Sequence, residues 1–75
     1  MELWIRSQHK GNLCKIMSLE IERTEEGYEI WNYNHNHHSS YLGVYKTQEK
    51  ALEVLDEIQK DIIFGLKKVY EMPVD

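Results

Sequence analysis

The spacing of hydrophobic residues along this chain changes once, close to residue 47. Before this point, apolar residues largely alternate with polar ones, which is typical of strands that place one face on a core. After it, they recur at intervals of three and four, which is typical of an amphipathic helix. The alternating pattern predicts strands at residues 2–7, 13–22, 28–34 and 40–46. The chain is therefore expected to be an α+β protein.

One long helix is expected after the four strands. Thr47 is a good N-cap, because its hydroxyl can accept a bond from a free backbone N–H one turn into the helix. Ile63 and Phe64 widen the apolar arc of this helix beyond what one small sheet needs, which indicates contact with a second subunit. The pattern also allows a short edge strand at 69–72, ended by Pro73. The apolar stripe itself consists of Ala51, Leu52, Leu55, Ile58, Ile62 and Leu66.

These elements predict a single domain, residues 1–75, in the order ββββα(β). The expected architecture is an antiparallel sheet of four or five strands with the long amphipathic helix packed on one face. Turn residues at 9–12 and 24–27 separate the first three strands. Ile16 interrupts the alternation of the second strand, so a bulge or a change of facing is expected there.

The two faces of the predicted sheet differ, since a single helix covers only one of them. One parity collects aliphatic residues and is expected to face the helix: Leu3, Ile5, Leu19, Ile21, Ile30, Leu42 and Val44. The other parity collects aromatic and cationic residues: Trp4, Arg6, Trp31, Tyr33, Tyr41 and Tyr45. A face that its own chain leaves uncovered is expected to bind another copy, another protein or a flat ligand.

Composition narrows the classes of function. A chain of 75 residues lies near the lower size limit for a self-sufficient core, so homo-oligomerisation is an expected means of stabilisation. Cys14 is the single cysteine, which excludes an internal disulfide and a thiolate zinc site. The net charge of −4 argues against binding to DNA, RNA or a membrane surface. No segment has the pattern of a signal peptide or a membrane span, which predicts a cytoplasmic location.

The aromatic face is the first candidate for chemistry. Trp, Tyr and Arg are the residues in which binding energy concentrates at interfaces. The flat rings of Trp4, Trp31, Tyr33 and Tyr41 can also stack on a nucleobase. The alternative is structural: the same residues would fill the interface between two sheets of a homodimer. Both hypotheses stay open, because a cleft at a dimer interface is itself a common place for a ligand.

A polar cluster at the end of the first strand is the second candidate. Arg6, Ser7, Gln8 and Lys10 bring four hydrogen-bonding groups within five residues, and the guanidinium of Arg6 can grip a phosphate. The spacing is not that of a phosphate-binding loop, and a solvated strand end is the structural alternative. The cluster is therefore a candidate for recognising a phosphate or the edge of a nucleotide.

The polar loop between the third and fourth predicted strands contains His35, His37 and His38. Two imidazoles in a His-x-His pattern can share a metal, but no third ligand follows from the spacing, so no metal site is predicted. A loop that contacts a ligand through His37 is the functional hypothesis, and a mobile polar loop is the alternative. Cys14 has no base linked to it by any sequence signature, so no catalysis and no cofactor are predicted.

Four stretches of the chain resemble a group of small proteins. They are LWIRSQHK at 3–10, YLGVYKT at 41–47, ALEVLDEIQ at 51–59 and YEMP at 70–73. The group comes from Gram-positive bacteria and their phages, usually has an acidic residue where His9 stands, and varies in the length of its central loop. The resemblance implies an architecture and a phage or prophage setting in the bacterial cytoplasm, without a defined mechanism.

The leading functional hypothesis is a phage anti-defence protein that sequesters a nucleotide second messenger of bacterial immunity, by analogy with phage sponge proteins. The small anionic nucleotide would be bound without turnover by Trp4, Arg6, Ser7, Gln8, Lys10, Trp31, Tyr33, His37 and Tyr41. The main alternative is an inhibitor or regulator that binds a host protein through the aromatic face or the acidic helix. A third hypothesis is a structural homodimer with the aromatic face internal.

Overall fold

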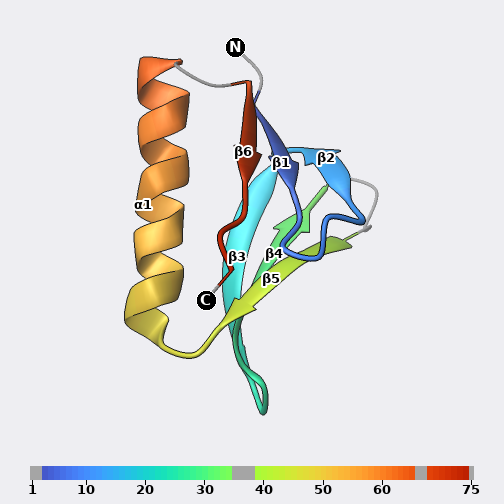
Figure 1. The fold of residues 1–75 in the computed structure, drawn as a ribbon, viewed down its shortest axis with the longest axis vertical. Helices are drawn as coiled ribbons and strands as arrows, with labels where there is room; N and C mark the ends of the chain where they lie inside the picture. The colour runs from blue at the N-terminus through green and yellow to red at the C-terminus, as the bar shows by residue number, and fades with distance from the viewer. Residues whose placement is uncertain (1–2, 35–38, 66–67, 75) are drawn as a thin grey trace.

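The protein is an α+β domain with one helix beside two small sheets (Figure 1). The computed structural model describes residues 3–34, 39–65 and 68–74. The described strands are β1 (Trp4–Arg6), β2 (Leu13–Lys15), β3 (Ser18–Thr24), β4 (Gly27–Tyr33), β5 (Ser39–Tyr45) and β6 (Val69–Glu71), and the helix is α1 (Gln48–Phe64). The prediction of an α+β chain with one helix and a short strand after it is confirmed. None of the helical structure described here is long and apolar enough to cross a membrane.

The prediction of one sheet with the order ββββα(β) is wrong. The strands form two three-stranded sheets, with the orders β2-β1-β6 and β3-β4-β5. β6 pairs with β1 in parallel, and the other pairings are antiparallel. The split arises because the predicted strand 13–22 breaks at Ile16–Met17 into β2 and β3, which belong to different sheets.

Asn32 holds this break in place. It is a polar residue on the core side of β4 and is buried, with 5% of its surface exposed. The side-chain oxygen accepts bonds from the backbone N–H groups of Met17 and Ser18 at 2.9 and 3.2 Å. The side-chain nitrogen donates to the carbonyl of Lys15 at 2.9 Å. One buried amide therefore satisfies the backbone groups that a continuous strand would have paired.

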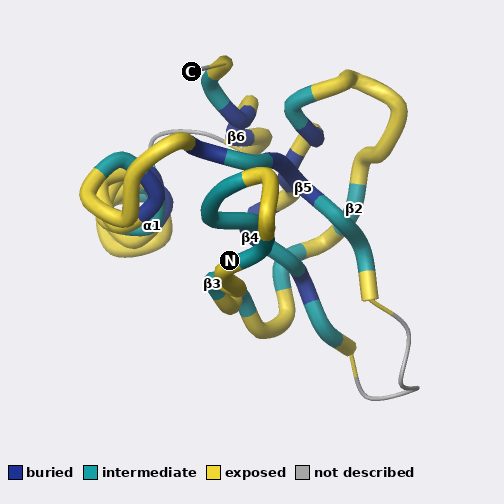
Figure 2. Tube along the Cα trace, turned by 90° about the horizontal axis from the view of Figure 1, so that it is seen from below, coloured by how far each residue is buried: buried dark blue, intermediate teal, exposed yellow. Residues whose placement is uncertain are grey.

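The core lies where the inner faces of both sheets meet α1. Every element except β2 and β3 contributes fully buried apolar residues, and Figure 2 shows the buried stretches converging between the sheets and the helix. Leu19 and Ile21 of β3 are only partly buried at its margin. The fully buried members are Leu3, Ile5, Ile30, Leu42, Tyr45, Ala51, Val54, Ile58, Tyr70 and Met72.

A β-bulge in β5 reverses the facing of its last two residues. Trp31 pairs with Tyr41, but the preceding Ile30 pairs with Gly43, so Leu42 is an extra residue between them. An extra residue shifts the alternation of every later side chain by one. As a result, Tyr45 is buried in the core, while Val44 pairs with Glu29 on the opposite face. The sequence-based placement of Val44 in the core and of Tyr45 on the aromatic face is therefore wrong.

The ends of α1 follow from local chemistry. The hydroxyl of Thr47 accepts a bond from the N–H of Lys50 at 3.1 Å, which confirms the predicted N-cap. The helix ends at Phe64, earlier than the apolar stripe suggested, because Gly65 adopts the left-handed conformation with φ of 62°. Its N–H donates to the carbonyl of Asp61 at 2.8 Å, which is a common way to close a helix.

Candidate interaction surface

The outer face of the sheet β3-β4-β5 carries an aromatic row, defined as Trp31, Tyr33 and Tyr41. Trp31 and Tyr41 are cross-strand partners, and their rings meet edge to face with centroids 5.5 Å apart and planes at 68°. Trp31 and Tyr33 lie one above the other along β4, with centroids 6.5 Å apart. The imidazole of His9 is nearly parallel to the Tyr41 ring, at 6.2 Å, and extends the row. These residues form one connected aromatic surface, as their parity in the strands predicts.

An acidic border lies beside the aromatic row and consists of Glu20, Glu22 and Glu29. Glu20 pairs with Trp31 across the strands, and Glu22 pairs with Glu29. The indole N–H of Trp31 donates to Glu29 at 2.9 Å, and the hydroxyl of Tyr33 donates to Glu22. Two of the three carboxylates therefore orient aromatic side chains of the row.

The pKa values of two tyrosines in the row are raised. The pKa of Tyr33 is raised from 10.0 to about 12, first by its hydrogen bond to Glu22, then by partial desolvation and by the charges of Glu22 and Glu20. The pKa of Tyr41 is also raised, mainly by burial and then by the charges of Glu29 and Glu26. The carboxylates of Glu20, Glu22 and Glu29 contribute to these shifts, and they would repel a further anion on this face. The surface therefore suits a cation better than a phosphate.

Trp4, predicted to stack on a base, and Arg6, predicted to contact phosphate, do not join this row. Trp4 and Arg6 lie in β1, which belongs to the other sheet, on the opposite parity to the buried Ile5. The prediction that they share one sheet face with Trp31, Tyr33 and Tyr41 is wrong, because β1 pairs with β2 and β6 and not with β4 or β5. The remaining aromatic candidate, Trp4, has none of the ring contacts found in the row.

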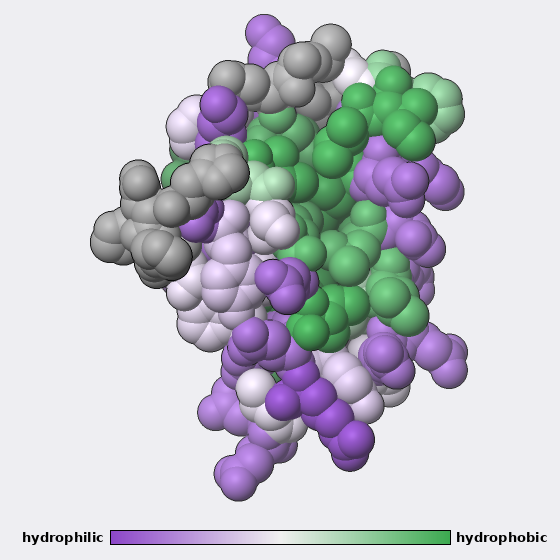
Figure 3. All heavy atoms as spheres, turned by 180° about the vertical axis from the view of Figure 1, so that it is seen from behind, coloured by the Kyte–Doolittle hydropathy of each residue, from purple (hydrophilic) through white to green (hydrophobic). Residues whose placement is uncertain are grey.

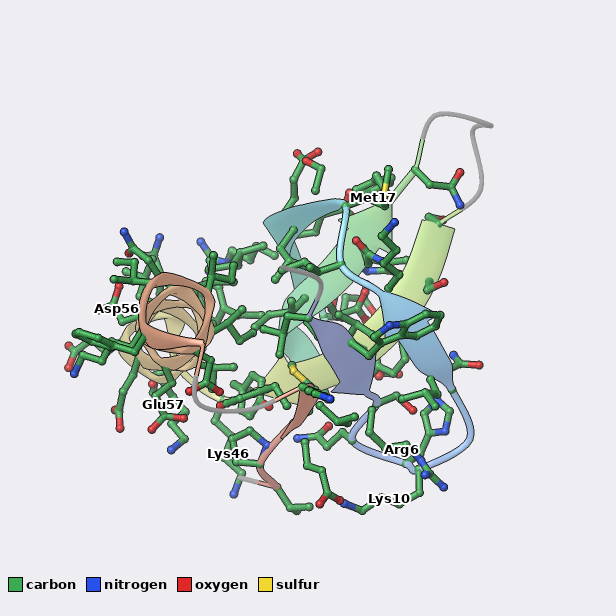
Figure 4. All side chains as sticks on the ribbon, turned by 90° about the horizontal axis from the view of Figure 1, so that it is seen from above. Arg6, Lys10, Met17, Lys46, Asp56 and Glu57 are labelled. Carbon is green, nitrogen blue, oxygen red and sulfur yellow. The ribbon has the colours of Figure 1, made fainter. Side chains whose placement is uncertain are left out.

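The two candidate cations already have partners within the fold. The Nε of Arg6 donates to the carbonyl of Lys10 at 2.9 Å, and the Lys10 ammonium meets a carboxylate oxygen of Glu71 at 2.9 Å. Figure 4 shows Arg6 and Lys10 close together, on the other side of the molecule from Met17. Both contacts are exposed to solvent, so they are weak. The Glu71 carboxylate offsets the charge of Lys10, whereas the carbonyl contact leaves the charge of Arg6 unchanged.

Ser7 and Gln8 are structural residues of the turn after β1. Ser7 is fully buried and accepts a bond from the N–H of Asn12 at 3.0 Å. Beside the β5 bulge, the Gln8 side chain bonds to backbone groups in the way that a neighbouring strand would. It accepts a bond from the N–H of Val44 at 3.0 Å and donates one to the carbonyl of Val44 at 3.2 Å. It also donates to the carbonyl of Pro73 at 3.0 Å. Both side chains therefore make hydrogen bonds within the fold. His37 lies outside the described residues, as do His35 and His38.

The aromatic row is a surface and not a pocket. The two most distinct hollows over the described residues lie elsewhere. One, of about 270 Å³, is lined by Gln8, Val44 and Val74 among others, and the other, of about 350 Å³, surrounds the β3–β4 turn. Small ligands usually bind in enclosed clefts, whereas protein partners bind to flatter surfaces. The shape of the row therefore favours a macromolecular partner.

Comparison of the chain with protein families, with curated proteins and with solved structures found no match. The resemblance to small proteins of Gram-positive bacteria and their phages therefore stays a prediction. The function has to be argued from the residues and their geometry alone.

The acidic border was not predicted from the sequence. Glu20, Glu22 and Glu29 alternate with aliphatic residues and have the strand parity that places them with Trp31 and Tyr33. That parity was readable from the sequence, but a strand pairing was needed to bring the glutamates of β3 beside the aromatic residues of β4. The contact of His9 with Tyr41 was not predicted either. No local pattern in the sequence shows that the turn at 7–12 packs beside β5.

Proposed function

We propose that this protein acts without turnover, as a binding protein that recognises a positively charged protein partner through its aromatic row and acidic border. The observation that carries the proposal is the position of Trp31, packed between two tyrosines and hydrogen-bonded to Glu29. Tryptophan and tyrosine on a flat surface supply binding energy, and the surrounding glutamates select a basic partner.

The negative charge of the acidic border favours this function over nucleotide sequestration. A nucleotide would bring its phosphates to a surface where Glu20, Glu22 and Glu29 already raise the potential energy of an anion. A lysine or arginine of a protein partner meets the same carboxylates with favourable energy and can also lie on the aromatic rings. Sequestration of an immune nucleotide stays a prediction, as does the anti-defence role, and both are alternatives in the test.

The test compares three kinds of probe by NMR titration of the ¹⁵N-labelled protein. The probes are a peptide of alternating lysine and valine, a matched peptide of alternating glutamate and valine, and a panel of cyclic dinucleotides and ADP-ribose isomers. We expect the lysine peptide to shift the indole N–H signal of Trp31 in a saturable way. Neither the glutamate peptide nor the nucleotides should do so.

A pair of matched variants locates the site. Trp31→Ala is expected to weaken binding of the lysine peptide about tenfold or more, as expected for the loss of a central aromatic residue. Trp4→Ala removes the same side chain from the outer face of the other sheet and should leave the affinity unchanged, provided that circular dichroism shows both variants folded. Saturable binding of a nucleotide that is lost in Trp4→Ala and kept in Trp31→Ala would instead support sequestration and sink the proposal.

A further inference from the structure

The free edge of β3 lies directly beside the acidic border. Over the parts of the chain that the structure describes, β4 is the sole strand paired with β3, and β3 extends for seven residues. In an edge strand every second residue directs its N–H and C=O away from its one neighbour, towards any strand that arrives. By contrast, the bulged part of β5 is covered by the Gln8 side chain. The second sheet therefore offers a strand-docking edge on the β3 side.

The inner side of this free edge is apolar. Leu19 and Ile21 face the core from β3 but are only partly buried. The neighbouring surface of α1 is what we term the apolar overhang, consisting of Leu52, Leu55 and Ile62. Leu52 and Ile62 are 47% and 50% exposed, although they lie next to the buried stripe of the helix. An apolar arc wider than the core it covers indicates surface available to a partner.

The overhang lies on the β3 side of the helix. Glu57 accepts a bond from the hydroxyl of Tyr70 at 2.5 Å, so that side of α1 faces β6. Residues two apart in a helix point in nearly opposite directions, which turns Leu55 away from β6. Figure 3, seen from behind, shows the hydrophobic residues gathered in one continuous area beside the hydrophilic outer side of the helix. The edge of β3 thus has an acidic outer side and an apolar inner side.

A second copy of the chain does not fit this edge. Antiparallel pairing of two β3 strands places residues of the same face opposite each other. In the symmetric registers centred on Glu20, Ile21 or Glu22, a glutamate of one copy always lies opposite a glutamate of the other. Like charges in opposed positions destabilise a strand pair, so the sequence of β3 disfavours self-pairing.

We infer that β3 takes up an extended segment of the basic partner as a fourth strand, with lysine or arginine side chains over Glu20 and Glu22 and apolar side chains between Leu19, Ile21 and the overhang. The inference rests on the proposed function and specifies how the partner binds. Backbone bonds to the free edge would supply affinity, and the alternation of basic and apolar residues would supply specificity.

The test uses a seven-residue lysine–valine peptide, as long as β3, in two backbone-methylated forms. One form is methylated on the nitrogen of every valine and the other on that of every lysine. Because successive N–H groups of a strand point to opposite edges, only one form blocks the bonds to β3. We expect one form to lose binding at least tenfold and the other to bind like the unmodified peptide, with slower hydrogen exchange of the β3 amides in the complex.

Charge reversal provides the matched control. Glu20→Lys is expected to weaken the peptide about fivefold, because a favourable cross-strand pair becomes a repulsive one. Glu53→Lys makes the same change in net charge on the exposed side of α1 and should leave the affinity within about twofold.

Two outcomes would overturn strand addition. If both methylated forms bind as well as the unmodified peptide, the partner binds the aromatic surface without joining the sheet, and only the proposed function survives. If sedimentation shows that the protein dimerises and that Glu20→Gln with Glu22→Gln strengthens the dimer while excluding the peptide, the edge belongs to a second copy.

Discussion

At the scale of single residues, polar side chains decide which strands meet. The side chains of Gln8 and Asn32 each bond to backbone groups of a neighbouring segment, at places where the regular pairing of strands is interrupted. Gly43 permits the first of these contacts, since a Cβ there would lie 3.1 Å from the Gln8 side chain. A residue that looked like part of a ligand site is thus a structural bridge.

Replacing Gln8 tests this structural role. Gln8→Met keeps the length of the side chain but removes its bonds to Val44 and Pro73, at a cost of about 2–3 kcal/mol in the free energy of unfolding. Urea denaturation followed by circular dichroism measures the change. Gln59→Met, on the exposed side of α1, is the control and should change stability by less than about 0.5 kcal/mol. A Gln8 variant as stable as this control would contradict the bridging role.

Tyr33 carries a prediction about pH. Its pKa in the folded protein is about 12, against an ordinary value of 10.0, so the folded state holds this proton more tightly. The resulting stabilisation is complete below about pH 10 and is lost as the pH rises from 10 to about 12. NMR of the tyrosine Cζ signal should give the raised midpoint. Glu22→Gln should move it back towards 10, whereas an unchanged midpoint in that variant would rule out the hydrogen bond as the main cause.

At the scale of elements, the periodicities of the sequence identified most of the structure. The helix, its Thr47 cap, the two long strands after residue 27 and the strand before Pro73 follow from local patterns. Sheet membership does not, because the parallel pairing of β1 with β6 joins residues more than sixty positions apart. The facing of Val44 and Tyr45 depends on a bulge that only the pairing with β4 reveals.

The N-cap of α1 gives a prediction at this scale. Thr47→Ala removes the acceptor for the N–H of Lys50 and should lower the free energy of unfolding by about 1 kcal/mol. Thr47→Ser keeps the hydroxyl and should retain most of that stability. Thermal denaturation of the two variants side by side checks the difference. Equal loss in both would show that the cap contributes little.

At the scale of the whole molecule, β6 closes the core from the far end of the chain. Tyr70 and Met72 are both buried, and the C-terminal segment is held by the Tyr45 hydroxyl, which donates to the carbonyl of Pro73 at 2.7 Å. The described part of the structure therefore depends on a few residues that follow the helix. Strand parity predicts the aromatic row, but the complete candidate surface is visible only at this scale, because its parts come from β3, β4, β5 and α1.

Truncation tests the role of β6. A chain ending at Lys68 would lose two core residues and a strand partner of β1, which is expected to abolish cooperative unfolding in a domain of this size. A chain ending at Pro73 lacks only Val74, which is 74% exposed, and Asp75, and should fold normally. Dispersed amide signals in the shorter chain would contradict this account.

The glutamates of β3 also have a consequence for the protein before it meets any partner. A long edge strand with apolar residues on one side can act as a template for fibril growth, and we expect the charges of Glu20 and Glu22 to oppose it. Exchange of both for glutamine should therefore shorten the lag time of fibril formation at neutral pH, as thioflavin fluorescence would show. The same two carboxylates would then serve both the proposed recognition of a basic partner and protection against aggregation.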